Sequence, residues 1–163
     1  MPFVGNVLNP CIIMDKSLPN DIFFGLVTDQ LEQGRTITIP LTGTSMSPTL
    51  QQGRDNLVLA PLSPNVPLRR YDVVLFRYRG AYILHRIMKI KGDTLVTRGD
   101  ALVSTETPLR SDLVARLIAV KDTQTGKVTQ CHSLKWKLLS RKTVLIKFIK
   151  VKVRRTFRVN LDK

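Results

Sequence analysis

The stretch Gly43-Thr44-Ser45-Met46-Ser47-Pro48-Thr49-Leu50 is the feature from which the fold and chemistry of this chain are best approached. It follows an alternating apolar run and places Ser45 at a turn. A serine hydroxyl at its free pKa is a weak nucleophile, so it needs a base, a group that orients the base and a donor for a developing oxyanion. Ser45 is therefore interesting only if the chain supplies those groups elsewhere.

Candidates for these groups follow Ser45 along the chain. His85 lies in an apolar run typical of a strand, Asp100 follows Gly99 at the end of the next such run, and Glu106 comes shortly after. Histidine suits a general base near neutral pH, and a carboxylate can hold the imidazole in one tautomer. Both Asp100 and Glu106 are candidates for the orienting carboxylate.

Each candidate also has an ordinary structural interpretation. Ser45 fits a simple turn beside glycine and proline, and Asp100 fits a turn carboxylate that binds its own backbone. His85 fits a core imidazole bonded to the main chain. Lys89 is a second candidate base, in a Ser-Lys dyad, because strict strand alternation would place it on the same face as His85.

Short apolar runs separated by turn residues dominate the middle of the chain. A period of two predicts a strand over 36–41 that delivers Ser45, and Arg79-Gly80 predicts a hairpin turn. Further strands are predicted over 57–60, 72–76, 81–90, 94–98, 113–120 and 127–129. Residues 1–18 are expected to be extended or irregular. Several short strands with regular turns indicate a mostly β domain, either a barrel or a coiled sheet.

One helix is predicted near residues 20–33, ahead of these strands. Asn20 suits its N-cap, Asp21 suits the positive end of its dipole, and Gly34 suits its end. Apolar side chains at helical spacing form a stripe that we expect to pack against the body. They are Ile22, Phe23, Leu26, Val27 and Leu31.

Length and composition favour a single domain with a real core, because 163 residues bury a large share of the unfolded surface. Cys11 and Cys131 neither demand a disulfide nor match a metal-ligand spacing, and His132 has no further ligands nearby in sequence. We expect a reducing compartment, no metal and no organic cofactor. No run reaches the ~18 apolar residues of a membrane-spanning helix, and the amino terminus is a poor secretory signal. The expected location is the cytoplasm, with contact to the inner membrane face if the basic tail binds lipid.

The formal net charge of +14 is concentrated in the last part of the chain. Residues 134–163 hold eleven Lys or Arg against Asp162, so we divide the chain into a body at 1–133 and a basic amphipathic extension at 134–163. The first half of the extension fits an amphipathic helix, whereas 149–153 alternates like a strand. Three interpretations stay open: a peripheral anchor on anionic lipid, a nucleic-acid-binding segment, or a basic edge strand that docks on the body. Few stacking aromatics disfavour nucleic acid.

Four sequence boxes occur in a recognisable order, at residues 43–50, 71–76, 85–87 and 98–100. Their order and spacing resemble the signal peptidase I and LexA-type serine peptidase superfamily. The box His85-Arg86-Ile87 is similar to that of the archaeal and endoplasmic-reticulum signal peptidases, whereas the bacterial signal peptidases and LexA-like proteins use a lysine base. The resemblance implies the coiled antiparallel sheets of that catalytic fold and a serine endopeptidase that cleaves an extended peptide or leader segment.

The resemblance also implies roles for individual residues. Ser45 would attack the peptide carbonyl, His85 would take its proton, and the backbone N–H of Ser45 would help to bind the oxyanion. Asp100 matches the first position of the acid box, and Glu106 falls where some relatives carry a second aspartate. Gly43 stands where some relatives carry a serine hydroxyl donor, so it offers only its backbone.

Two departures from that superfamily bear on the function. Signal peptidases of this kind are normally anchored by a transmembrane helix, for which this chain shows no candidate. LexA-type repressors need a DNA-binding domain and a self-cleavage site before the serine, yet only 44 residues precede Ser45 and no alanine occurs before Ala60. The repressor interpretation is therefore disfavoured. The alternative from a different class is a catalytically silent regulatory module that binds a peptide or lipid on the same fold.

Overall fold

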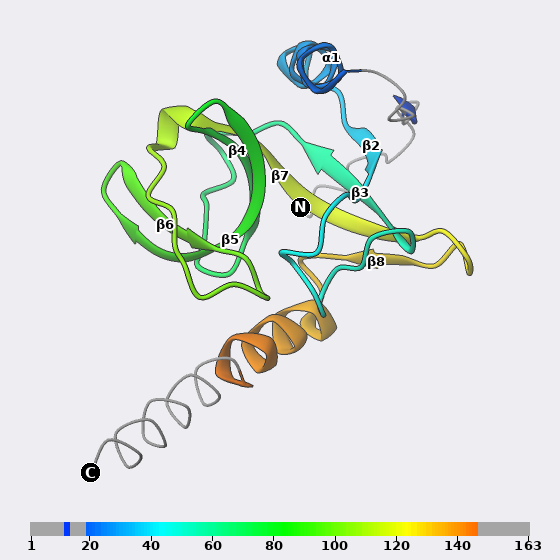
Figure 1. Ribbon diagram of the computed structural model, residues 1–163, viewed down its shortest axis with the longest axis vertical. Helices are drawn as coiled ribbons and strands as arrows, with labels where there is room; N and C mark the ends of the chain where they lie inside the picture. Colours follow the sequence, from blue (N-terminus) through cyan, green and yellow to red (C-terminus); the bar gives the residue numbers. More distant parts are fainter. Residues whose placement is uncertain (1–11, 14–18, 147–163) are drawn as a thin grey trace.

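The computed structural model describes residues 12–13 and 19–146, and within them the architecture is mostly β, as predicted. Eight strands form one sheet in the order β1-β2-β3-β7-β4-β5-β6, with β8 paired to β7. The β1–β2 pair is parallel and the other pairs are antiparallel. Figure 1 shows that the sheet is strongly coiled, with β4, β5 and β6 curling to one side of it.

The predicted strands all occur, with ends displaced by at most two residues. Their bounds are β2 (Ile37–Pro40), β3 (Asp55–Ala60), β4 (Val73–Tyr78), β5 (Ala81–Lys91), β6 (Thr94–Arg98), β7 (Leu113–Asp122) and β8 (Val128–Gln130). A short 3-10 helix, η1 (Arg110–Asp112), precedes β7, and β1 (Ile12–Ile13) lies where the sequence predicted no strand. Backbone pairing to β2, which no local pattern encodes, accounts for β1.

The β4–β5 hairpin positions the residues that matter most for the candidate site. Its turn residues Arg79 and Gly80 have φ values of 51° and 81°, as the predicted two-residue turn requires. The register pairs Val74 with His85 and Val73 with Arg86. Because successive strand side chains point to opposite faces, His85 and Arg86 enter two different environments.

The helix α1 (Asn20–Glu32) forms where it was predicted, but two details differ. Pro19 and not Asn20 occupies the N-cap position, with backbone angles outside the helical range. The apolar stripe is also narrower than predicted, since Ile22 and Leu26 remain 55% and 40% exposed. The reason is geometric, because Ile22 and Leu26 each lie about 100° around the helix axis from the next residue, which is the buried Phe23 or Val27.

Two hydrophobic clusters hold the sheet together. The larger one joins α1 to β2, β3 and β7 and includes Trp136, Met46 and Leu50. The smaller one lies among β4, β5, β6 and the start of β7 and includes Phe76, Ile87 and Leu95. The residue after Ser45 thus belongs to the main core, which fixes the serine turn to the sheet.

The described part of the C-terminal extension is a helix over 134–146, which agrees with the helical interpretation of its first half. Trp136 and Ser140 are buried against the body, whereas Leu134, Leu138 and Leu145 are exposed. The strand-like segment 149–153 lies outside the described residues. Among the helices that are described, none combines the length and apolar character needed to cross a membrane.

Candidate active site

His85 and Glu106 form the central contact of the candidate site. The Nδ1 atom of His85 lies 2.8 Å from Oε2 of Glu106, and the two side chains are 5% and 14% exposed. Glu106 is fixed by main-chain pairing with Thr97, through two N–H to O bonds of 3.0 Å, and its carboxylate also accepts a bond of 3.3 Å from the Thr97 hydroxyl. Of the two candidate carboxylates, Glu106 is therefore the one that contacts the imidazole.

Asp100 contacts Arg86 instead. Its two oxygens accept bonds of 2.8 Å and 2.7 Å from Nε and Nη2 of Arg86, in a bidentate pair whose side chains are 2% and 0% exposed. Such a pair satisfies both charges in the interior, where an unpaired charge is very costly. Asp100 thus lies on the opposite face of β5 from the imidazole and acts on the site through Arg86 and the adjoining backbone.

Arg86 also connects the sheet to the C-terminal helix. Its Nη1 donates to the carbonyl oxygen of Tyr71 at 3.0 Å and to the hydroxyl of Ser140 at 2.7 Å, and its guanidinium lies 5.9 Å from the ring centre of Trp136. From the sequence, Arg86 was named only as part of the box His85-Arg86-Ile87, with no role of its own. Its place within an apolar run typical of a strand was the indication of a role, because a buried arginine has to be paired.

The turn that carries Ser45 is held at both ends. Met46 and Leu50 are buried in the core, and the N–H of Leu50 donates to the carbonyl oxygen of Met46 at 3.0 Å. The buried carboxylate of Asp55 accepts a bond of 2.8 Å from the N–H of Gln51. Anchored in this way, Ser45 is only partly exposed.

Gly99 lies where the serine turn meets the imidazole. The N–H of Ala101 donates to the carbonyl oxygen of Ser45 at 2.8 Å. A Cβ placed on Gly99 would lie 2.6 Å from that carbonyl oxygen and 2.8 Å from Nε2 of His85. The carbonyl oxygen of Ser45 and Nε2 of His85 therefore both lie next to Gly99, and any side chain at this position would collide with them. The sequence suggested a turn at Gly99, but the structure gives close approach as the reason.

The two atoms that a Ser-His dyad would use are Oγ of Ser45 and Nε2 of His85. In the part of the chain that the structure describes, neither the Ser45 hydroxyl nor Nε2 of His85 makes a hydrogen bond. Catalytic hydrogen bonds are often long before substrate binds and tighten in the complex. The structure thus brings Ser45, His85 and Glu106 into one neighbourhood, with Nε2 on the side that faces the serine turn.

The two candidate oxyanion donors differ in their surroundings. The N–H of Gly43 donates to the side-chain oxygen of Gln52 at 2.9 Å, so this donor is already engaged. The N–H of Ser45 makes no hydrogen bond within the described residues, so it is free to bind a substrate oxygen. The sequence did not single out Gln52, which lies nine positions after Gly43 and closes the loop between them.

Lys89 does not share the face of His85, and that prediction was wrong. The pairing of β5 with β6 shifts between Ile87 and Lys89, where two steps along β5 match one step along β6. Such a bulge adds one residue and reverses the face of every side chain beyond it. Lys89 is also exposed, which leaves His85 as the base that the geometry favours.

Other sequence-based expectations concern metals and cysteines. Within the described ranges, no group of three or more His, Cys, Asp and Glu side chains is arranged to hold a metal ion. Cys131 is a free thiol, and burial raises its pKa to about 12. Cys11 lies outside the described residues.

Comparison of this chain with models of known protein families gave no match, and neither did comparison with curated proteins. Its function therefore has to be inferred from the order of its motifs and the geometry of this site.

Proposed function

We propose that this protein is a serine endopeptidase of signal-peptidase type, with Ser45 as nucleophile, His85 as general base and Glu106 as the orienting carboxylate. The observation that carries the proposal is the position of the imidazole. Its Nδ1 is held 2.8 Å from Glu106 while its Nε2 lies against Gly99 beside the Ser45 main chain. The strongly coiled, mostly antiparallel sheet agrees with the catalytic fold of the signal peptidase and LexA-type superfamily.

In the proposed reaction the Ser45 hydroxyl oxygen attacks the peptide carbonyl carbon as its proton passes to Nε2 of His85. The negative charge on the former carbonyl oxygen is bound by the N–H of Ser45, where one lost donor typically costs roughly 2.7–4 kcal/mol. Nε2 then gives its proton to the leaving amine. Water, activated by the same nitrogen, hydrolyses the acyl-enzyme and restores the serine. Glu106 keeps the Nδ1 proton in place throughout.

Asp100 has a positioning role in this proposal. Its ion pair with Arg86 fixes the Gly99-Asp100-Ala101 segment, and Ala101 in turn holds the carbonyl oxygen of Ser45. Loss of this pair would let the serine turn and the imidazole drift apart. Misplacement by about 1 Å can cost roughly 100-fold in rate even when the mutated residue is remote from the chemistry.

The proposed substrate is an extended peptide or leader segment. Main-chain hydrogen bonds to a strand edge would align such a peptide, and side-chain pockets would choose the residues next to the cleaved bond. The resemblance of the motif order to the signal peptidases supports this substrate class.

We also propose that the helix over 134–146 contacts an anionic membrane surface. At 100° per residue, Leu134, Leu138 and Leu145 lie together, opposite the buried Trp136 and Ser140. The cations on either flank of this leucine stripe are Lys135 and Lys142 on one side and Lys137 and Arg141 on the other. An apolar stripe between basic flanks is typical of helices that lie in a membrane interface.

One observation favours the second candidate, a catalytically silent module that binds a peptide on the same fold. The Ser45 hydroxyl donates no hydrogen bond to His85 in this structure, although both groups are available. A binding protein would hold the peptide at the same site without cleaving it and would not depend on the serine hydroxyl.

Intact-mass analysis after incubation with a mixed library of leader-like peptides separates the two candidates. We expect the wild type to cleave the peptides and Ser45→Ala to be inactive. Ser47→Ala is the matched control, because it removes the same group from the same turn. Peptide binding by wild type and Ser45→Ala, with no cleavage by either, would establish the binding module instead.

A further inference from the structure

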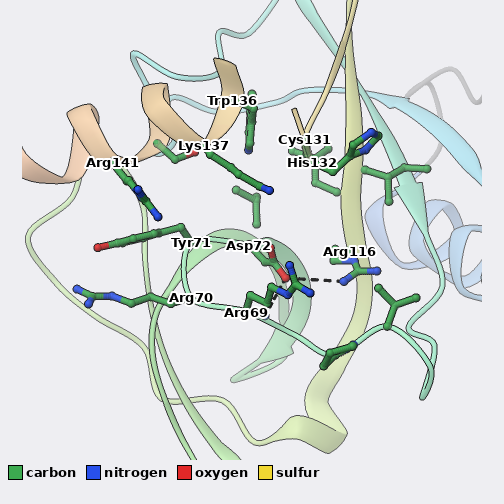
Figure 2. Close-up of a pocket in the computed structure, with 16 residues that line it drawn as sticks. Arg69, Arg70, Tyr71, Asp72, Arg116, Cys131, His132, Trp136, Lys137 and Arg141 are labelled. Carbon is green, nitrogen blue, oxygen red and sulfur yellow. Dashed lines mark hydrogen bonds and ion pairs between the residues drawn. The ribbon is translucent and has the colours of Figure 1, made fainter. Parts of the chain in front are cut away.

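A pocket separate from the proposed active site lies beside Arg86. This pocket of about 510 Å³ opens between the helix over 134–146, β7 and the segment at 66–73 (Figure 2). Ser45, His85 and Glu106 do not line it. The residues that do include five cations and one carboxylate: Arg69, Arg70, Arg116, Lys137, Arg141 and Asp72.

The charges around this pocket are poorly balanced. Asp72 accepts a bond of 2.9 Å from the backbone N–H of Arg69, and its carboxylate lies 3.8 Å from Nη1 of Arg116. Lys137 and Arg141 have no carboxylate partner among the described residues. Figure 2 shows their side chains extending from the helix toward the segment that carries Tyr71 and Asp72. Several like charges around one cleft focus a positive potential that draws in an anion.

We propose that this pocket binds a phosphate-bearing ligand, either a free phosphate ester or the headgroup of an anionic lipid. The planar guanidinium of Arg141 matches two phosphate oxygens, and Lys137 supplies a compact charge from the preceding turn of the same helix. Arg116 adds a third cation from β7, across the pocket. Five cations and one carboxylate leave an excess of four positive charges, and a dianionic phosphate would offset half of it.

The pocket also shares two of its residues with the contacts of Arg86. Tyr71 and Ser140 line it, and both accept hydrogen bonds from Nη1 of Arg86. A ligand held between the helix and the segment at 66–73 would therefore strengthen the packing of the helix on the sheet. Binding at this site is independent of the peptidase proposal, because none of its contacts requires cleavage.

The test is calorimetric titration with inorganic pyrophosphate at constant ionic strength. Lys137→Gln/Arg141→Gln removes two pocket cations, and Lys135→Gln/Lys142→Gln removes two cations of the same helix that do not line the pocket. We expect the control pair to bind within about twofold of wild type and the pocket pair to bind at least about tenfold more weakly. Pyrophosphate should also raise the thermal unfolding midpoint of the wild type, which tests binding without any variant.

Vesicles identify the source of the phosphate. If vesicles containing phosphatidylglycerol displace pyrophosphate and phosphatidylcholine vesicles do not, the ligand is a lipid headgroup. If neither displaces it, the pocket takes a free phosphate ester. The proposal is overturned if wild type neither binds pyrophosphate nor gains thermal stability from it, or if both charge-removing pairs weaken binding equally. The latter result would show a general attraction of anions to the basic helix.

Discussion

His85 and Glu106 are 21 positions apart in sequence, yet Nδ1 of the imidazole and Oε2 of the carboxylate are 2.8 Å apart. Glu106 reaches this position from a loop that pairs with β6 through Thr97. A carboxylate in this position keeps the proton on Nδ1, so that Nε2 is the basic nitrogen. In the proposed mechanism, the side of the imidazole that faces Ser45 is therefore the side that accepts a proton.

Glu106→Gln should leave the fold intact and lower kcat by roughly 10²–10⁴-fold, because the amide can present the wrong atom to Nδ1. Steady-state cleavage of a leader-like peptide measures the effect. Thr97→Val is the control, since it removes only the bond of 3.3 Å to the same carboxylate, and it should cost much less. Full activity in Glu106→Gln would remove Glu106 from the mechanism.

Asp100→Asn should lower the stability of the fold in addition to its effect on the site. Breaking a buried ion pair by removing one partner typically costs about 3–5 kcal/mol, because the other charge stays in the interior. Urea unfolding followed by circular dichroism measures this loss. The double variant Arg86→Met/Asp100→Leu should be more stable than Asp100→Asn, since it leaves no buried charge unpaired. If Asp100→Asn unfolds at the wild-type urea concentration, the pair is not buried as described.

Gly99→Ala should lower cleavage by roughly 100-fold or more, because its Cβ has to displace either the Ser45 main chain or the His85 ring. Gly25→Ala is the matched control. Gly25 lies inside α1 with nothing within 4 Å of an added Cβ, so alanine should raise stability by about 0.8–1 kcal/mol and leave cleavage unchanged. Equal activity in the two alanine variants would show that the space beside Gly99 is not needed.

The thiol of Cys131 should be slow to react at neutral pH. Burial raises its pKa from the ordinary 9.0 to about 12, so the native protein keeps it protonated. In a Cys11→Ser background, alkylation by iodoacetamide at pH 8 should be roughly 100-fold or more slower in the native than in the urea-unfolded protein. Because the folded-state pKa is the higher one, stability from this group is complete below pH 9 and declines as the pH rises toward 12. Equal alkylation rates would contradict the burial of this thiol.

Leu134→Ser/Leu138→Ser should weaken co-sedimentation with phosphatidylglycerol vesicles by about tenfold, since two leucines no longer enter the acyl boundary. Ile22→Ser/Leu26→Ser removes an exposed apolar pair from α1 and serves as the control. If vesicle binding falls equally in both double variants, general surface hydrophobicity and not the leucine stripe causes the binding. If the wild-type protein does not co-sediment with the vesicles, the proposed membrane contact is excluded.

Local patterns in the sequence were sufficient for β2 through β8 and for the position of α1, but not for β1. A period of two predicted β2, whereas short continuous apolar runs predicted β3 and β4. The predicted apolar stripe of α1 was too wide on the side of Ile22 and Leu26, because periodicity gives the direction of a stripe but not its width. On the other side of the stripe the prediction omitted Phe24, whose ring stacks on Tyr82 of β5 at a centroid distance of 4.3 Å.

The candidate site was only partly accessible from the sequence. The order of the motifs pointed to Ser45 and His85 as candidates. The choice between Asp100 and Glu106 could not be made from the sequence, because strand pairing decides which face of β5 each carboxylate contacts. The bulge between Ile87 and Lys89 is also set by pairing, so strict alternation assigned Lys89 to the wrong face. The cationic pocket brings together segments at 66–73, 116–118 and 131–141, which no local pattern connects.

The guanidinium of Arg86 joins three distant segments of the chain: the turn before β4, the end of β6 and the C-terminal helix. If the helix left the sheet, Arg86 would lose the Ser140 hydroxyl and the cover of Trp136 while still held in the interior by Asp100. That state is costly, so helix and sheet are expected to unfold as one cooperative unit. A protease that cleaves only opened segments would therefore find no cut site between 134 and 146 until the whole domain opened.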